Sequence, residues 1–213
     1  MNIATPQKTA SHLLLDVLEQ WGIDTIYGLP GDGINGIMEA PRQCQDRIPL
    51  ILARNEEDAA FMACAHAKWT GRIGCCLATT GPGGVHLLNG LYDAKFDRAP
   101  VLAITGLPYQ DLMQTHTQQD IDHTRLFSDV AAYSTAIFSA AHVENAASLA
   151  CRTALARRSV AHIALPVDVQ EEKLEDAERS PRNKPDHVTA AYVEGERDPN
   201  ADNFSGDRRC FSS

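Results

Sequence analysis

Short runs of apolar residues alternate with longer segments of helical periodicity along most of this chain. Near the N-terminus, Leu14, Leu18 and Trp21 recur at helical spacing and a glycine follows them, which predicts an opening amphipathic helix. Six apolar runs come next, at residues 25–29, 48–53, 74–78, 101–105, 132–138 and 161–166. Further helical segments are predicted at residues 56–69, 84–95 and 142–158.

Most of the apolar runs are continuous rather than alternating, which is typical of strands that are covered on both faces. Repeated strand–helix–strand units of this length predict right-handed crossovers and helices on both sides of one sheet. The pattern therefore predicts an α/β fold, in the form of a three-layer, doubly wound domain over residues 1–169. Its sheet is expected to be mainly parallel, with about six strands.

The character of the chain changes at about Gln170. Residues 170–213 contain few aliphatic side chains and many Asp, Arg, Asn and Gly residues. Such a composition offers too little apolar surface to offset the entropy of ordering. We expect an irregular polar tail there, disordered or a truncated linker, that the domain can lose without harm.

Composition narrows the class of protein. The chain has 213 residues, 44% of them hydrophobic, which is enough for a full core. A net charge of -9 argues against a nucleic-acid surface. Six cysteines without a Cys-x-x-Cys pair indicate buried thiols in a reducing compartment, and no apolar run near the N-terminus is long enough for a signal peptide or an intrinsic membrane segment. A cytoplasmic enzyme domain is the expectation.

Four short segments stand where a predicted strand gives way to a helix, at residues 28–33, 54–57, 80–83 and 88–90. In an open parallel sheet the carboxyl ends of the strands lie along one edge, so residues just past several strands meet around one crevice. This clustering predicts a ligand site.

The order and spacing of these segments, from about Thr9 to Val169, resemble the N-terminal pyrimidine-binding domain of the thiamine diphosphate-dependent enzymes in the pyruvate oxidase, acetolactate synthase and 2-keto acid decarboxylase group. The resemblance implies a thiamine diphosphate-binding domain that activates the aminopyrimidine of the cofactor. It further implies decarboxylation of a small 2-keto acid in the manner of pyruvate oxidase, with FAD as a further cofactor that the full-length enzyme could use. An acetolactate synthase-like carboligase and a truncated, non-catalytic binding or dimerisation module remain as alternatives.

Glu56 is the residue on which this chemistry is expected to depend. It opens a predicted helix whose next residues, 59–63, are apolar, so its carboxyl group is expected to face a partly desolvated cleft where the charged form is disfavoured. By resemblance, Glu56 shares a proton with the cofactor's aminopyrimidine ring and so promotes formation of the thiazolium ylid. The alternatives are an ordinary first-turn glutamate that interacts with the helix dipole, or Glu57 in its place.

The resemblance also assigns residues to the cofactor side of the site. These are Pro30, Gly31, Asp32, Thr80, Pro82 and Asn89. It makes Gln119 a candidate for orienting the substrate near the reacting carbon. A purely structural role is the alternative for these residues, because glycine and proline are common in tight turns and Asn89 could be a buried packing contact of its helix.

The segment at residues 31–36 reads Gly-Asp-Gly-Ile-Asn-Gly and matches two other motifs. It fits the dinucleotide pattern G-x-G-x-x-G, and it begins like the Gly-Asp-Gly motif with which thiamine enzymes hold Mg²⁺ and diphosphate. A dinucleotide site has no need of the Gly-Pro-Gly turn at residues 81–83. The metal motif requires an Asn pair downstream, which is absent. We therefore interpret this segment as a loop on the cofactor side.

A second candidate lies at residues 116–123, where two histidines and two aspartates occur together. Their spacing matches no standard zinc pattern, so a polar loop is expected and no metal ligands are predicted. His86 is interpreted as a packing residue rather than a base.

The resemblance implies that a second α/β domain holds the diphosphate and Mg²⁺, and that domain is absent from these residues. The chain is therefore expected to be a fragment of a larger enzyme, a truncated gene product or one subunit of a split enzyme. Its expected partners are a second copy of itself or a chain that carries the diphosphate-binding domain. Self-association is expected through the helices at residues 56–69 and 84–95, which carry more apolar residues than one sheet face needs. These are Phe61, Met62 and Trp69 on the first helix and Leu87, Leu88, Leu91 and Tyr92 on the second.

Overall fold

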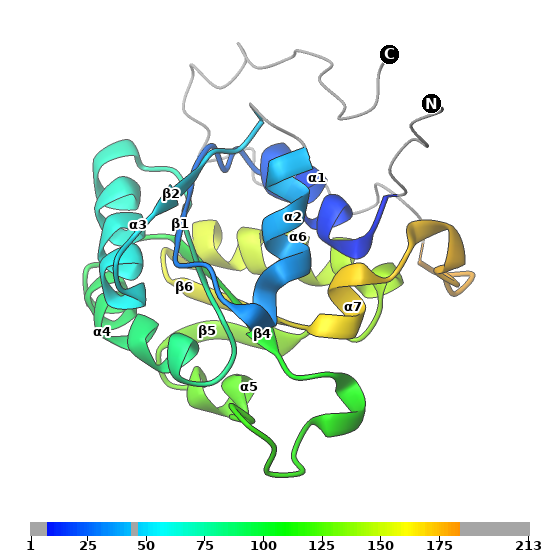
Figure 1. Cartoon of the computed structure of the whole chain (residues 1–213). Coiled ribbons are helices and arrows are strands. Elements are labelled where there is room, and N and C mark those ends of the chain that lie inside the picture. Colours follow the sequence, from blue (N-terminus) through cyan, green and yellow to red (C-terminus); the bar gives the residue numbers. More distant parts are fainter. Residues whose placement is uncertain (1–7, 44–46, 184–213) are drawn as a thin grey trace.

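The computed structural model describes residues 8–43 and 47–183. Its centre is a six-stranded sheet with the strand order β2-β1-β3-β4-β6-β5, in which every neighbouring pair is parallel. The strands are β1 Ile26–Gly28, β2 Leu50–Leu52, β3 Gly74–Ala78, β4 Val101–Leu107, β5 Ala131–Ala136 and β6 Val160–Pro166. Helices cover both faces of this sheet (Figure 1). The predicted three-layer α/β fold is confirmed.

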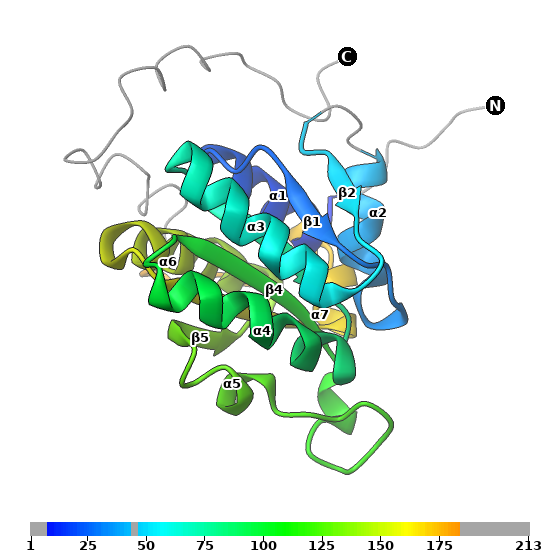
Figure 2. The same ribbon diagram turned by 90° about the vertical axis from the view of Figure 1, so that its left-hand side faces the viewer.

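The α-helices are α1 Ala10–Gln20, α2 Asn35–Gln43, α3 Glu56–Thr70, α4 Pro82–Phe96, α5 His123–Leu126, α6 Ala140–Arg157 and α7 Val167–Glu171. Short 3-10 turns occur at η1 Asp32–Ile34, η2 Gln110–Leu112 and η3 Leu174–Asp176. Figure 2 shows α3 and α4 side by side on one face of the sheet, with α1 and α6 behind it. In the part of the chain that the structure describes, no helix is long and apolar enough to cross a lipid bilayer.

Strand β4 shows why the apolar runs are continuous. All seven of its residues are buried. Leu102 and Ile104 belong to the core cluster that the sheet shares with α1 and α6, whereas Val101 and Ala103 belong to the cluster under α3 and α4. Because side chains alternate between the faces of a strand, a strand that is covered on both sides is apolar at nearly every position, and the one buried polar side chain of β4, Thr105, is hydrogen-bonded.

Local capping determines where the two helices nearest the predicted site begin. The Asn55 side chain accepts a hydrogen bond from the Glu57 N–H at 3.0 Å, so α3 starts at Glu56. Gly71, in the left-handed conformation with φ 73°, ends the same helix. Pro82 is the first residue of α4, where its missing N–H costs nothing.

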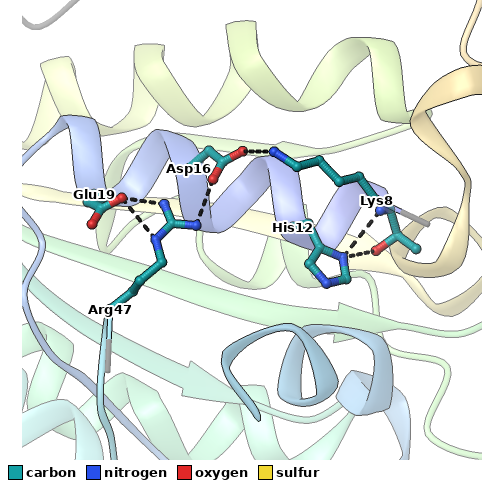
Figure 3. A network of polar contacts seen from close by, with 6 residues as sticks. Lys8, His12, Asp16, Glu19 and Arg47 are labelled. Atoms are coloured by element: carbon teal, nitrogen blue, oxygen red, sulfur yellow. Dashed lines mark hydrogen bonds and ion pairs between the residues drawn. The ribbon is translucent and has the colours of Figure 1, made fainter. Parts of the chain in front are cut away.

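An ion-pair network joins the approach to β2 with α1 (Figure 3). Arg47, whose side chain is 9% exposed, donates from Nη1 to Asp16 Oδ1 at 2.8 Å and from Nε to Glu19 Oε2 at 3.0 Å. Lys8 Nζ lies 3.4 Å from the other Asp16 oxygen. A guanidinium this deeply buried needs paired carboxylates to offset the loss of its hydration. The pairs therefore hold the outermost strand of this edge against the opening helix.

The folded chain continues beyond residue 169. Gln170, which the sequence places at the start of the tail, is completely buried. Its Nε2 donates to the carbonyl of Gly33 at 2.9 Å and to that of Leu165 at 3.0 Å, while its Oε1 accepts from the Ile37 N–H at 3.3 Å. One polar side chain thus satisfies three backbone groups in the interior, which composition averaged over the whole tail cannot reveal.

The residues that follow Gln170 also contact the domain. The N–H of Ala140, at the start of α6, donates to Glu172 Oε2 at 2.7 Å, and the N–H of Ala10 donates to the Glu172 carbonyl at 2.9 Å. Asn183 donates from Nδ2 to a backbone carbonyl of α6 at 2.8 Å. The segment up to Asn183 therefore joins the starts of α1 and α6. The rest of the predicted tail, residues 184–213, lies outside the described residues.

We predict that Gln170→Met destabilises the domain, because methionine matches the length of glutamine but cannot form the hydrogen bonds to two carbonyls and one N–H. Each buried hydrogen bond contributes about 0.5–1.5 kcal/mol, so the loss of three should lower the free energy of unfolding by about 2 kcal/mol or more. Urea unfolding monitored by circular dichroism measures it. The matched control, Glu171→Met at the exposed neighbour, should change stability by less than about 0.5 kcal/mol. Equal stability of the two variants would contradict the prediction.

Candidate functional site

The loops that follow β1 and β3 are in direct contact at the carboxyl edge of the sheet. The Gly33 N–H donates to Thr79 Oγ1 at 3.1 Å. A Cβ on Gly31 would lie 2.4 Å from Thr79 Cβ, and a Cβ on Gly33 would lie 2.2 Å from Thr80 Cγ2. Neither distance is sterically allowed, so the two loops can touch only because both positions are glycine.

The Gly-Pro-Gly turn after β3 brings backbone next to the Glu56 carboxyl group. Gly81 has φ 59° and ψ -118°, a conformation that favours glycine, and α4 begins immediately after it. A Cβ on Gly83 would lie 2.8 Å from Thr79 Cγ2 and 3.3 Å from Glu56 Oε1. The carboxyl group and the first turn of α4 therefore face each other with no side chain between them.

Glu56 itself is 7% exposed. Its Oε2 lies 3.0 Å from Nδ1 of His86, which projects from the second turn of α4. Because the carboxyl group stands at the first residue of α3 and beside the first turn of α4, the positive ends of two helix dipoles act on it. Glu57 is more exposed and uses its N–H to complete the Asn55 cap. Of the two glutamates, Glu56 is the one that faces the turn.

The loop at residues 113–122 covers the same turn. Thr80 Oγ1 donates to Gln119 Oε1 at 2.6 Å, and a Cβ on Gly81 would lie 2.9 Å from Gln119 Cα. Gln119 has φ 62°, which is unusual for a residue other than glycine. Asp120 supports this conformation, since its carboxylate accepts the N–H of His116 at 2.9 Å. The expected polar loop is thus present, and its carboxylate is used to organise the backbone.

Five of the residues expected at the site lie around the contact between these loops. They are Gly31, Glu56, Thr80, Pro82 and Gln119. Thr79 connects them, because it contacts the loop after β1 and the turn before α4 together. The convergence that was predicted from parallel strand ends is therefore observed for this group.

Three other expected residues have exposed side chains. Pro30 and Asp32 are exposed, and Asp32 Oδ1 accepts from Asn35 Nδ2 at 3.0 Å. Asn89 is also exposed and lies seven residues beyond Pro82, about 10 Å further along α4 at 1.5 Å per residue. Asn89 is thus neither buried nor adjacent to Glu56.

Sequence reasoning assigned no functional role to His86, which the structure pairs with Glu56. The signal that could have revealed it is helical spacing, because His86 follows Gly83 by three residues and so shares its face of α4. His123 was assigned to the polar loop at residues 116–123, but it is the first residue of α5. It is completely buried, and its Nε2 lies 3.1 Å from the carbonyl oxygen of Gly81.

Among the described residues, no group of three or more His, Cys, Asp or Glu side chains is arranged to hold a metal ion.

Two cavities in the described part of the chain lie away from Glu56. One of about 1050 Å³ lies between α2 and β2, and one of about 310 Å³ lies under the loop at residues 113–122. Neither is lined by Glu56 or Gly83, so the cavity volume does not coincide with the convergence of predicted residues.

Comparison with known proteins identifies similar sequences. The family model described as "Thiamine pyrophosphate enzyme, N-terminal TPP binding domain" matches residues 8–126, more than half of the chain. The Bacillus subtilis protein YdaP is 41% identical over 192 residues, which cover 90% of this chain and 32% of that protein.

Two relatives carry the names of enzymes. Pyruvate oxidase of Lactiplantibacillus plantarum is 43% identical over 160 residues, which are 75% of this chain and 26% of the enzyme. Acetolactate synthase of Bacillus subtilis is 34% identical over 164 residues, which are 76% of this chain and 28% of the enzyme. The chain thus spans about a third or less of the length of these relatives.

The buried histidines predict a pH dependence of stability. Burial lowers the pKa of His123 and lowers that of His162 well below its usual value, which favours the neutral form of both rings in the folded chain. In the unfolded chain a histidine binds a proton below about pH 6.5. The stabilising contribution is therefore complete above about pH 6.5 and is lost as the pH falls below it, by up to about 1.4 kcal/mol per pH unit for each histidine.

Urea unfolding at pH 7.0, 6.0 and 5.5 measures this slope. His162→Gln should flatten it, because one neutral buried histidine is removed, whereas His116→Gln at an exposed position should leave it unchanged. A free energy of unfolding that stays constant between pH 7.0 and 5.5 would contradict the prediction.

Proposed function

Because the chain belongs to the family of thiamine pyrophosphate enzyme N-terminal domains, we propose that it supplies the aminopyrimidine-binding half of a thiamine diphosphate site in an enzyme that decarboxylates a 2-keto acid. The observation that carries the proposal is the buried Glu56 carboxyl group opposite the backbone of Gly83. Among named reactions, that of pyruvate oxidase is favoured over that of acetolactate synthase, since the relative with the former name is 43% identical and the latter 34%.

The residues present fit an aminopyrimidine. An aminopyrimidine is a flat ring with polar edges. Its site needs protein backbone without side chains, so that the face of the ring can approach closely, and a carboxyl group that can hydrogen-bond to a ring nitrogen. The backbone of Gly83, which faces Glu56 with no side chain between them, meets the first need, and the Glu56 carboxyl group meets the second. Thiamine diphosphate, when bound, supplies the nucleophilic thiazolium carbon of the reaction. The task of this chain is to hold a proton between Glu56 and the ring.

His86 and Gln119 would complete the site. His86 holds one carboxyl oxygen of Glu56, Oε2, which leaves Oε1 on the side of Gly83 for the ring nitrogen. Gln119, which accepts from Thr80 at 2.6 Å, retains its side-chain amide N–H groups for a substrate carboxylate or carbonyl. We therefore assign Glu56 the proton-holding role and Gln119 a substrate-orienting role.

The diphosphate and Mg²⁺ need ligands of another kind. Magnesium prefers carboxylate and phosphate oxygens, and the described residues contain no cluster of such groups. We propose that a second domain holds the charged end of the cofactor, either in a partner chain or in a longer form of this protein, and that any FAD belongs to that larger assembly. A catalytically inactive module that only docks on such a partner is the competing proposal.

A direct test uses the aminopyrimidine half of the cofactor by itself, 4-amino-5-hydroxymethyl-2-methylpyrimidine, which needs no diphosphate ligands. We predict that titration of the chain with this compound shifts the amide resonances of Thr80 and Gly83. Glu56→Gln should weaken the binding at least about tenfold, the value of one lost charge-assisted hydrogen bond.

Glu57→Gln is the matched control, because it makes the same chemical change one residue away, and it should leave the affinity unchanged. Binding that depends on Glu57 instead, or an absence of shifts at the turn, would refute the assigned role of Glu56. In any assembled enzyme, Glu56→Gln should also abolish exchange of the thiazolium proton while the fold is kept.

The outer surface of α3 and α4 is proposed as the contact with a partner. Its large apolar residues include Trp69 at 92% exposure, Phe96 at 76% and Phe61 at 42%. A surface of this kind on a domain with a complete core usually marks an interaction site. The expectation that Leu87 and Leu91 belong to the same surface is wrong, because both are completely buried toward the sheet.

We predict that the purified chain associates with itself through this surface. Sedimentation velocity over a range of concentrations should show a dimer that dissociates on dilution. The double variant Phe61→Glu with Phe96→Glu should be monomeric, because charge replaces apolar contact. Phe138→Glu, at a 60% exposed residue outside α3 and α4, is the control and should still associate. A strict monomer at every concentration would exclude the contact between copies.

A further inference from the structure

A hydrogen-bonded series of polar side chains, all buried except the half-buried Ser134, crosses three strands and ends at the Gly-Pro-Gly turn. It begins at Ser134 on β5, whose Oγ lies 2.8 Å from Nδ1 of His162 on β6. His162 Nε2 lies 2.9 Å from Thr105 Oγ1 on β4. Thr105 Oγ1 in turn lies 2.9 Å from Nδ1 of His123, and His123 Nε2 lies 3.1 Å from the carbonyl oxygen of Gly81.

The positions of the hydrogens in this hydrogen-bonded series can be assigned by starting from the Gly81 end. The Gly81 carbonyl can only accept, so His123 must carry its proton on Nε2 and leave Nδ1 as an acceptor. Thr105 then donates its one hydroxyl proton to His123 Nδ1 and must accept from His162 Nε2. His162 Nδ1 is left to accept from the hydroxyl of Ser134. With this assignment all four bonds run in one direction, toward Gly81. The Ser134 hydroxyl also lies 3.3 Å from the Thr124 carbonyl, but its shorter contact, at 2.8 Å, is the one to His162.

This order requires both imidazoles to be neutral, because a protonated ring donates from both nitrogens. The surroundings meet that requirement. His123 and His162 are both completely buried, and the ring of Phe127 stacks on His162 with centroids 3.9 Å apart and planes at 14°. Burial lowers the pKa of both histidines, and the charged groups acting on them are the carboxylate of Asp122 and each other.

His123 touches both parts of the site that surround the turn. Its ring occupies the space beside the first turn of α4, since a Cβ on Gly84 would lie 2.6 Å from His123 Cε1. The same residue opens α5 directly after the loop that carries Gln119, and Asp122 caps that helix by accepting from the Arg125 N–H at 3.1 Å. A single rigid ring therefore joins the turn before α4 to the loop that covers it.

We propose that His123 is a positioning residue. Held as the Nε2–H tautomer by Thr105, His162 and Ser134, it fixes the carbonyl of Gly81 and keeps the turn and the Gln119 loop in register with Glu56. The assignment of the turn to a cofactor rests on the proposed function, but the hydrogen-bond chain and its effect on the turn belong to the protein without ligand.

The first experiment measures the tautomers of the unmodified full chain by long-range ¹H–¹⁵N correlation at neutral pH. The expected result is a proton on Nε2 and a bare Nδ1 for both His123 and His162. A proton on Nδ1 of His123, or an imidazolium at either position, would overturn the proposal whatever happens to any variant.

The second experiment interrupts the series of hydrogen bonds at Thr105 by substitution and measures the effect on the Gly-Pro-Gly turn. Thr105→Val preserves shape but can neither donate to His123 nor accept from His162. The Val85 N–H, which shares the Gly81 carbonyl at 3.3 Å, is the reporter. We expect its hydrogen exchange to accelerate at least about tenfold relative to the amides of β4, as the loss of one buried hydrogen bond would produce.

Thr135→Val is the matched control. Thr135 lies on strand β5, and its hydroxyl hydrogen-bonds to neighbours on the same strand, among them the Ala136 carbonyl at 3.3 Å. Its substitution should leave exchange at Val85 unchanged. An unchanged Val85 rate in Thr105→Val, or equal acceleration of all core amides, would show that the histidines serve only general stability. Both experiments use the chain without cofactor, so they remain decisive even if the aminopyrimidine fails to bind.

Discussion

The contact between the loops after β1 and β3 is the constraint on which the rest of the site depends. Gly33 lies against Thr80 at a distance that no side chain could allow, its N–H is bonded to Thr79, and its carbonyl accepts from Gln170. A residue more than a hundred positions away thus completes the hydrogen bonding of this loop. The contact places Thr79 beside Gly83, and Gly83 faces Glu56.

The electrostatic consequence follows from the layer arrangement. Helices α3 and α4 lie side by side on the same face, and their N-termini both stand at the carboxyl edge of the sheet. A carboxyl group at the start of α3 is therefore exposed to two helix dipoles while it is shielded from water. His86 restrains one of its oxygens. This gives one face of the Glu56 carboxyl group a structural partner and leaves the other toward the backbone of the turn.

The fold could be predicted from the sequence because the sheet is covered on both sides. Strand β4, with seven buried residues in a row, leaves no ambiguity about its surroundings. The edge strand β2 is less regular, and only Leu50–Leu52 of the predicted residues 48–53 form it. The helix start at Glu56 could be predicted because it depends on local residues, among them the cap Asn55 one position away, whereas the role proposed for Glu56 came from the resemblance.

The remaining site residues depend on contacts that are distant in the sequence. His123 bonds to a carbonyl 42 residues away and Gln170 to one 137 residues away, and neither carries a local pattern that distinguishes it from a loop or tail residue. Asn89 shows that a correctly predicted helix does not by itself reveal where each of its side chains points. Its helix was predicted correctly, but it stands between Leu87 and Leu91, which both face the sheet, so its own side chain points to solvent.

The decisive measurement is the position of a bound aminopyrimidine on the chain, from intermolecular NOEs between its ring methyl group and the protein. We predict NOEs to the protons of Gly83 and to the side chain of Thr80, beside the Glu56 carboxyl group. NOEs instead to Met38, in the cavity between α2 and β2, or to Met113, in the cavity under the 113–122 loop, would contradict the assignment of this turn as the cofactor site.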